Sequence, residues 1–196
     1  SQRNNKIVMT KTKKLTLCAL LTALSVVLMF VSKALPAPWL QGGSITLASM
    51  VPIVAASIIV DYKWGLLSGV VFALIQMMTG FYPPPTQTFL NFFLVIMLDY
   101  ILAFGVLGTA GIFYRLLGKK IWAIPVSGFI VTTLRYICHI LSGILIWGVY
   151  ADEGQTVLGY SLVYNGSYMI PEIIITTVVL AALSAFIKKE ADKVNG

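Results

Sequence analysis

Residues 121–149, with the sequence IWAIPVSGFIVTTLRYICHILSGILIWGV, form one apolar segment that carries two ionisable side chains, Arg135 and His139. A helix of about 20 apolar residues is long enough to cross the hydrocarbon core of a bilayer. Ionisable side chains are costly at that depth, and they generally face a protein interior, a partner group or a water-filled cavity. The segment therefore predicts a membrane-spanning helix whose polar face is turned into the protein.

The composition of the whole chain favours the same class of protein. Of its 196 residues, 58% are hydrophobic and 11% are charged, and the mean hydropathy is +0.89. A soluble domain of this length has too much surface to hide so many apolar side chains. The longest polar stretch is the basic tail of residues 1–14, so no soluble catalytic domain is expected. We predict an all-α integral membrane protein with a single domain, residues 1–196.

Six apolar segments are predicted to be transmembrane helices in one bundle. They cover residues 15–33, 46–60, 64–80, 88–114, 121–149 and 157–187. None alternates as the strands of a membrane barrel do. The segments 46–60 and 64–80 are short, and we expect them to use flanking residues, to tilt or to thin the bilayer. The start of the chain resembles a signal peptide, but further apolar segments follow it, so 15–33 is taken as the first span.

Most basic residues are predicted to lie on one side of the membrane. In the six-span arrangement that side holds twelve of the 14 Lys and Arg residues: Arg3, Lys6, Lys11, Lys13, Lys14, Lys63, Arg115, Lys119, Lys120, Lys188, Lys189 and Lys193. An excess of Lys and Arg marks the cytoplasmic side, which predicts that both termini are cytoplasmic. The net charge of +7 is then a signal of topology, and binding to nucleic acid is not expected.

The sequence lacks common motifs of ATPases and hydrolytic enzymes. It contains no GxxxxGK[ST] loop, no HExxH zinc motif and no GxSxG motif. Cys18 and Cys138 fall at different depths of different spans, so neither a disulfide nor a metal pair is expected. We expect a non-enzymatic transport or binding protein without a cofactor, whose energy comes from a partner or from an ion gradient.

Four ionisable side chains are predicted to lie within the spans: Asp99, Arg135, His139 and Glu172. One explanation is structural, with Arg135 paired to Glu172 and His139 satisfied in the interior. The other is that these groups line a binding site.

Helical spacing supports the second explanation. His139, Gly143 and Trp147 (or its neighbour Ile146) recur along one stripe of the fifth span, and Gly143 would leave a gap for a flat ring. A second stripe, on the sixth span, contains Tyr160, Tyr164, Asn165, Tyr168 and Glu172. With Asp99 from the fourth span, these side chains predict an outward-opening pocket. Aromatic faces and a carboxylate favour a flat organic cation, and the amide, hydroxyl and imidazole groups suit the edge of a heterocycle.

Several stretches connect the chain to a known family. They are ALLTAL, VDYKWGLLSG, MMTGF, LDYILAFGVLGTAG, RYICHILSGILIWGVYA and YSLVYNGSYMIPE, of which the last three are the specific ones. From Ala19 onward the chain resembles the thiamine-specific substrate-binding subunits (S components) of energy-coupling factor (ECF) vitamin transporters. The resemblance implies a multi-pass protein of a prokaryotic plasma membrane. It would bind thiamine from outside and dock onto a membrane coupling subunit that carries two ATPase subunits.

The resemblance also implies roles for individual residues. Ala19 and Ala23, a small-xxx-small pair that permits close helix approach, would form the docking surface, although packing within the bundle is the alternative. The ligand would be held by Asp99, Tyr100, His139, Gly143, Trp147, Tyr160 and Asn165. His139 and Trp147 would enclose the aminopyrimidine ring, and Asp99 would face the thiazolium charge. Ring nitrogens would bond to Tyr160 and Asn165.

Some positions depart from the family pattern. The acidic residue of the family is usually Glu, and Asp99 is one methylene shorter, which predicts a weaker or water-mediated contact. Trp39 and Tyr82 are the nearest candidates for two further aromatic positions. Tyr168 and Glu172 are added to the predicted site from helical spacing alone.

Three alternatives remain open at this point. The first is an S component for another flat heterocycle, such as hydroxymethylpyrimidine or riboflavin. The second is a carrier coupled to protons or other cations, with Asp99, Arg135, His139 and Glu172 as a relay. The third is a membrane enzyme, which would convert the bound molecule.

Overall fold

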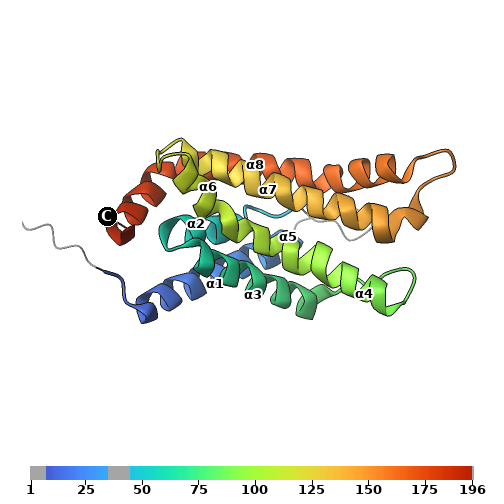
Figure 1. Cartoon of the computed structure of the whole chain (residues 1–196), viewed down its shortest axis with the longest axis horizontal. Coiled ribbons are helices and arrows are strands. Elements are labelled where there is room, and N and C mark those ends of the chain that lie inside the picture. The colour runs from blue at the N-terminus through green and yellow to red at the C-terminus, as the bar shows by residue number, and fades with distance from the viewer. Residues whose placement is uncertain (1–7, 35–44, 196) are drawn as a thin grey trace, which may run out of the picture.

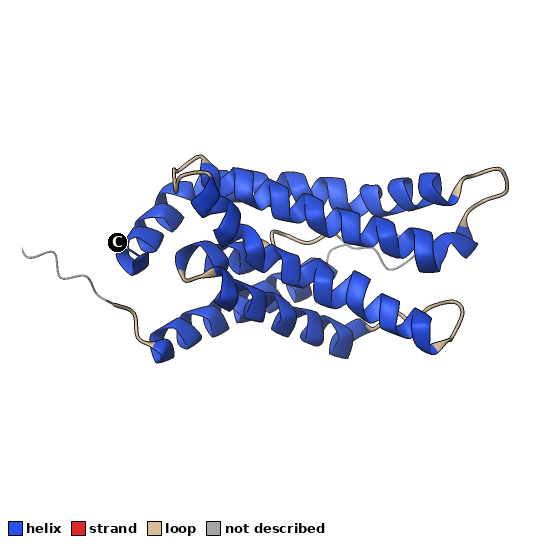
Figure 2. Ribbon diagram, in the orientation of Figure 1, coloured by secondary structure: helices blue, strands red, loops and turns tan. Residues whose placement is uncertain are grey.

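The computed structural model describes residues 8–34 and 45–195. These residues form a bundle of helices, and no strand occurs among them (Figure 2). The helices run roughly along one long axis, so the bundle has two distinct ends (Figure 1). The prediction of an all-α protein is confirmed.

Polar side chains cap the first turn of several helices. Thr10 precedes α1 (Lys11–Lys33), Asp61 precedes α3 (Tyr62–Gly80) and Thr88 precedes α4 (Phe89–Val95). Each capping side chain accepts a hydrogen bond from a backbone N–H group of the first turn, which satisfies a donor that the helix itself leaves free.

Several long helices are composite. α4 continues through the π-helix η1 (Ile96–Ile101), α5 (Leu102–Gly105), the 3-10 helix η2 (Val106–Thr109) and α6 (Ala110–Leu116). α7 (Ala123–Ser142) continues through the π-helix η3 (Gly143–Trp147) and the 3-10 turn η4 (Gly148–Tyr150). α8 (Val157–Asn195) is the last helix. α2 (Val51–Ile59) is the shortest helix that does not continue directly into another helical segment.

Five helical segments of the described chain are long and apolar enough to cross a membrane: Lys11–Lys33, Tyr62–Gly80, Phe89–Leu116, Ala123–Tyr150 and Val157–Val194. Large apolar side chains cover their outer surfaces, among them Leu20, Phe30, Phe93, Phe129, Val163, Val178 and Phe186. An exposed apolar surface of this extent is stable in contact with lipid rather than water. The chain is therefore a multi-pass membrane protein.

The second predicted span, 46–60, differs from the prediction. α2 has only nine residues, and at about 1.5 Å per residue its length is about 14 Å, too short to cross a bilayer. Every residue of α2 is buried, and α1, α3, α6, α7 and α8 pack around it. A helix that is apolar on all sides can be surrounded by lipid or by protein. Here protein surrounds the helix. The sequence pattern alone does not distinguish a helix surrounded by protein from one surrounded by lipid.

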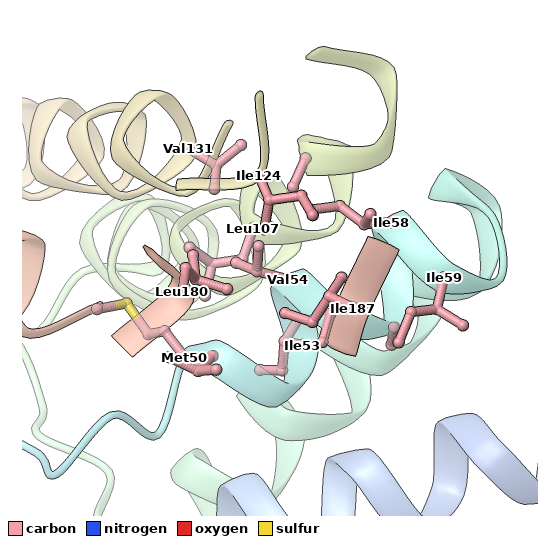
Figure 3. Packing of buried hydrophobic residues seen from close by; sticks show 14 of the residues in the cluster. Met50, Ile53, Val54, Ile58, Ile59, Leu107, Ile124, Val131, Leu180 and Ile187 are labelled. Atoms are coloured by element: carbon pink, nitrogen blue, oxygen red, sulfur yellow. The ribbon is translucent and has the colours of Figure 1, made fainter. Parts of the chain in front are cut away.

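The main apolar core is built around α2 at one end of the bundle. Figure 3 shows side chains from α2 and its N-cap, η2, α7 and α8 meeting there: Met50, Ile53, Val54, Ile58, Ile59, Leu107, Ile124, Val131, Leu180 and Ile187. Residues Met50, Ile53, Val54, Leu107, Ile124 and Leu180 have no exposed surface. Such a core resists changes of volume, since interiors are packed at the density of organic crystals.

Glycines allow the helices of this core to approach closely. A side chain at Gly108 of η2 would collide with the backbone of Gly65 and Leu66 in α3. Ser57 of α2 reaches the same region, where its hydroxyl donates to the Gly108 carbonyl and accepts the Gly111 N–H at 2.8 Å. The backbones of α3 and η2 are thus in direct contact, and the small Ser57 side chain joins α2 to η2 and α6.

Many residues at the end of the bundle where α1 begins and α8 ends (Figure 1) are basic. They are Lys11, Lys13, Lys14, Lys63, Arg115, Lys119, Lys120, Lys188, Lys189 and Lys193. Arg115 pairs with Asp61 across this end at 3.1 Å. Partial burial raises the pKa of Asp61, but hydrogen bonds from the Lys63 N–H and the Arg115 guanidinium outweigh it and hold that pKa below its usual range.

The glycine contact gives a matched test of the packing. Gly108→Ala should destabilise the protein by roughly 1–3 kcal/mol or more, because overpacking here displaces backbone rather than a flexible side chain. Gly105→Ala is the control, since its new methyl would meet only Val70 Cγ2 at an ordinary 3.8 Å. Thermal unfolding in detergent, followed by circular dichroism, should show a lower Tm for the first variant alone. Equal Tm values for both would contradict this packing.

Candidate ligand-binding site

A cavity of about 250 Å³ lies in the half of the bundle away from the basic end. Its walls come from the end of α3 and the following loop, from η1 and α5, from the end of α7 through η4, and from the start of α8. The lining residues are Gln76, Gly80, Tyr82, Asp99, Tyr100, Phe104, Arg135, His139, Gly143, Trp147, Tyr150, Tyr160, Tyr164, Asn165 and Tyr168. This size is near the lower limit of small-molecule sites, roughly 300–1,000 Å³.

Both π-helices lie at this cavity. η1 carries Asp99, and η3 carries Gly143 and Trp147. A π-helical turn repeats at i+5 rather than i+4, and such turns are frequent at functional sites. The wider turn places Trp147 on the same side as Ser142, five residues earlier, and the indole Nε1–H donates to the Ser142 hydroxyl at 3.2 Å. Ile146 is buried instead, which resolves the two alternatives in favour of Trp147.

The Asp99 carboxylate is bound by three donors from the neighbouring helix. His139 Nδ1 lies 3.0 Å from Oδ1. The Ser142 hydroxyl donates to Oδ2 at 2.6 Å, and the Trp147 indole donates to the same oxygen at 3.1 Å. A carboxylate offers about four acceptor positions, so these contacts orient Asp99 without exhausting it. The side chain keeps 18% of its surface exposed, on the cavity.

His139 is held at both ring nitrogens. Arg135 Nε lies 3.3 Å from His139 Nε2, and an arginine N–H can only donate. Nε2 therefore accepts, which leaves Nδ1 to carry the proton that is donated to Asp99. The three side chains form a buried chain of hydrogen bonds that runs from a guanidinium through a neutral imidazole to a carboxylate.

Aromatic rings in contact with one another form much of the remaining wall. The Trp147 ring lies 5.5 Å from that of Tyr82 and 6.2 Å from that of Tyr150. Tyr160 and Tyr164 stack on α8 with centroids 5.7 Å apart. Rings in contact with one another are partly fixed before a ligand arrives, which lowers the entropy lost on binding.

Tyr100 fixes the loop that carries Tyr82. Its hydroxyl accepts the Tyr82 backbone N–H at 3.1 Å and donates to the Gly80 carbonyl at 3.4 Å. The Tyr100 ring also stacks on Phe81, with centroids 5.6 Å apart. Tyr100 thus joins the end of α3 to η1 at the edge of the cavity.

Gly143 and Asn165 hold α7 and α8 together. A side chain at Gly143 would collide with Ser161 of α8, so this glycine permits close helix packing, whereas the spacing suggested a gap for a ring. The Asn165 amide donates to the His139 carbonyl at 3.0 Å and to the Ser161 carbonyl at 2.9 Å. Its oxygen accepts the Tyr168 hydroxyl at 2.6 Å. These contacts fix the cavity wall on this side.

The structure brings together nine of the eleven residues predicted to contact a ligand. They are Tyr82, Asp99, Tyr100, His139, Gly143, Trp147, Tyr160, Asn165 and Tyr168. Trp39 lies outside the described residues. Glu172 does not line the cavity, because four residues along α8 carry it about 6 Å deeper than Tyr168.

Glu172 and Arg135 do not form the ion pair that was considered from sequence. Among the ion pairs of the described residues, neither residue appears. Glu172, 1% exposed, accepts a hydrogen bond from the Thr46 backbone N–H. Arg135 contacts His139 and, through Nη1, the Met50 sulfur at 2.8 Å. The buried acid is therefore bound to backbone, and the buried base to the site.

Four lining residues were missed by the sequence analysis: Gln76, Gly80, Phe104 and Tyr150. Gln76 gave a usable signal, because an amide within an apolar span is itself costly and calls for a polar partner. Phe104, Gly80 and Tyr150 gave none, because an apolar or aromatic residue in a span is ordinary packing. In the described part of the chain, no cluster of three His, Cys, Asp or Glu side chains is placed to hold a metal ion.

Comparison with known proteins places the chain in a family. Residues 15–191 match the family described as Thiamine transporter protein (Thia_YuaJ). The chain belongs to this thiamine transporter family. The resemblance to a thiamine-specific family seen in the sequence is confirmed.

Named relatives in the thiamine transporter family come from bacteria. The chain is 36% identical over 177 residues to Thiamine transporter ThiT of Bacillus subtilis (strain 168), a match that covers 84% of this chain and 86% of that protein. It is 30% identical over 95 residues to Thiamine transporter ThiT of Lacticaseibacillus paracasei, covering 44% and 47% of the two chains.

The fold of this thiamine transporter family member is also similar to a solved structure. ThiT from Listeria monocytogenes superposes with a TM-score of 0.68 at 24% sequence identity. The match covers 91% of this chain and 96% of the other. The arrangement of helices described above is therefore one that a solved protein also adopts.

The contacts of Asp99 give a test that needs no ligand. Asp99→Asn places an NH₂ group where the native carboxylate meets only donors, so at least one donor loses its acceptor. A buried donor without a partner costs about 1–3 kcal/mol, and we expect a lower Tm in detergent. Asp152→Asn, in the exposed loop after η4, should leave Tm unchanged. If both substitutions act alike, Asp99 is not held as described.

Proposed function

We propose that this protein is the substrate-binding membrane subunit of an ECF-type transporter that takes up thiamine, with ATP hydrolysis supplied by separate partner subunits. The main support is that a carboxylate and a set of aromatic rings line one cavity in a member of the thiamine transporter family. Thiamine joins a positively charged ring to an aminopyrimidine, and both parts are flat. Such a cavity suits a molecule of this chemistry better than a neutral aliphatic one.

The thiazolium charge is proposed to lie near Asp99. The carboxylate keeps acceptor capacity beyond its three protein donors, and its exposed surface faces the cavity. The rings of Trp147 and Tyr82 line the same cavity, and aromatic rings attract a flat cation. Tyr160 and the free lone pair of the Asn165 oxygen are candidates for the edge of the aminopyrimidine. Asp99, Tyr100, His139 and Gly143 complete the set that the family resemblance assigns.

The membrane orientation follows from the two ends of the bundle. The basic end is proposed to be cytoplasmic, in the plasma membrane of a prokaryote, since Lys and Arg are retained on that side. The cavity lies in the other half and would open to the outside. Both chain termini are then cytoplasmic, because α1 begins and α8 ends at the basic end of the bundle.

The first helix offers a surface for the coupling subunit. Ala19 and Ala23 are both exposed on α1, while Cys18 and Thr22 face the interior. The exposed pair supports docking over packing within the bundle, because small residues let a partner helix approach closely.

Calorimetry of the purified protein tests the proposed ligand. Thiamine should bind one-to-one without ATP. His139→Ala and Trp147→Ala should each weaken binding roughly tenfold or more, about 1.4 kcal/mol or more, because each removes a cavity wall and a partner of Asp99. Phe129→Ala, on the exposed face of α7, is the control and should bind as the native protein does. Binding of riboflavin or hydroxymethylpyrimidine in preference to thiamine would overturn the assignment.

Reconstitution tests the proposed energy source. In liposomes, this chain alone should not accumulate thiamine, and accumulation should require the coupling subunit, both ATPase subunits and ATP. Ala19→Trp with Ala23→Trp should abolish uptake while leaving thiamine affinity in detergent unchanged, since both side chains are far along α1 from the cavity lining. Uptake by the chain alone that an uncoupler abolishes would instead establish an ion-coupled carrier.

A further inference from the structure

Arg135 presents an electrostatic conflict within the proposed site. Its side chain lines a cavity that is proposed to bind a cation, and the residue is 9% exposed. No carboxylate among the described residues forms an ion pair with it. Like charges that share a cavity of low dielectric constant repel each other. Considered as a point charge alone, Arg135 would weaken the binding of thiamine.

The contacts of the guanidinium reduce this conflict. Its plane lies over the Phe104 ring, with the central carbon 4.4 Å from the ring centroid, so the negative face of the ring offsets part of the charge. One nitrogen points away toward the Met50 sulfur, at 2.8 Å. A second nitrogen, Nε, is directed at His139 Nε2. The guanidinium is thus held against the cavity wall by three residues: Met50 just before α2, Phe104 of α5 and His139 of α7.

The contact with His139 has a consequence for Asp99. A ring nitrogen that accepts a hydrogen bond cannot also carry a proton, so the imidazole bears its single proton on Nδ1 and is neutral. It donates that proton's hydrogen bond to Asp99 Oδ1. A doubly protonated ring in the same place would form an ion pair with Asp99 and cancel its charge. The donor from Arg135 keeps Asp99 as the net negative group on the cavity.

We propose that Arg135 is a positioning residue that gives the site its preference for a cationic ligand, by fixing His139 as a neutral donor to Asp99. This inference rests on the proposed binding of thiamine. Arg135 then acts indirectly, through the His139 ring and its hydrogen bond to Asp99. This indirect effect raises the affinity for thiamine, whereas the charge of Arg135 by itself would lower it.

The sign of one substitution separates the two effects. Arg135→Met removes both the charge and the donor and retains a long unbranched side chain. If direct repulsion dominates, thiamine binds this variant more tightly. If Arg135 acts through His139, thiamine binds it roughly tenfold or more weakly, in keeping with the loss of a hydrogen bond within a charged network. Arg135→Gln is the conservative variant, because it removes the charge but retains an N–H donor, and it should keep most of the native affinity.

An uncharged analogue distinguishes charge preference from general damage to the cavity. Thiamine and an analogue in which a neutral thiophene replaces the thiazolium are titrated into the native protein and both variants. The ratio of their affinities should fall roughly tenfold in Arg135→Met and remain near the native ratio in Arg135→Gln. In a His139→Phe background, Arg135→Met should no longer lower this ratio, because the residue through which it acts is gone.

Nitrogen NMR of the protein labelled at its single histidine provides a second readout. The native protein should show Nδ1 protonated and Nε2 unprotonated, with the same pattern in Arg135→Gln and its loss in Arg135→Met. An unchanged pattern or an increased affinity ratio in Arg135→Met overturns the proposal. If the native protein fails to bind thiamine, the proposed function fails, and the NMR comparison still decides whether Arg135 sets the state of His139.

Discussion

The carboxylate of Asp99 is the interaction on which the ligand-binding half of the molecule depends. It accepts hydrogen bonds from His139, Ser142 and Trp147, and it thereby connects η1 to the end of α7 and to η3. Within a bilayer these groups cannot form hydrogen bonds with bulk water, so they must bond to one another or line a water-filled cavity. Both π-helices take part in this contact, because η1 carries the acceptor Asp99 and the wider turn of η3 carries the donor Trp147.

The sequence alone was sufficient to predict that Asp99 and His139 converge on one cavity. Asp99 and His139 lie 40 residues apart in the chain, and their meeting could be anticipated because each is too costly to face lipid. Register and depth could not be anticipated in the same way. The choice between Ile146 and Trp147 depended on a π-helical turn, which leaves no mark in an apolar pattern. Glu172 continued a perfect four-residue spacing, yet its spacing carried it below the cavity.

The partners of buried charged groups could not be predicted from the sequence either. Opposite charges on neighbouring spans suggested that Arg135 would pair with Glu172. In the structure each has a different hydrogen-bond partner, the Thr46 N–H for Glu172 and the His139 ring for Arg135. Segment 46–60 shows the same limit for a whole element. Its composition is that of a transmembrane span, but a helix enclosed by five others and a helix enclosed by lipid require the same residues.

The position of α2 determines how deep a ligand can go. The helix begins directly after Met50, and the Met50 sulfur meets the guanidinium that forms part of the cavity wall. One additional turn at the start of α2 would remove about 5.4 Å of that depth. In this architecture the length of α2, a helix that does not line the cavity, therefore limits the size of an acceptable ligand. Evolution can change that length without changing the groups that recognise the charge of the ligand.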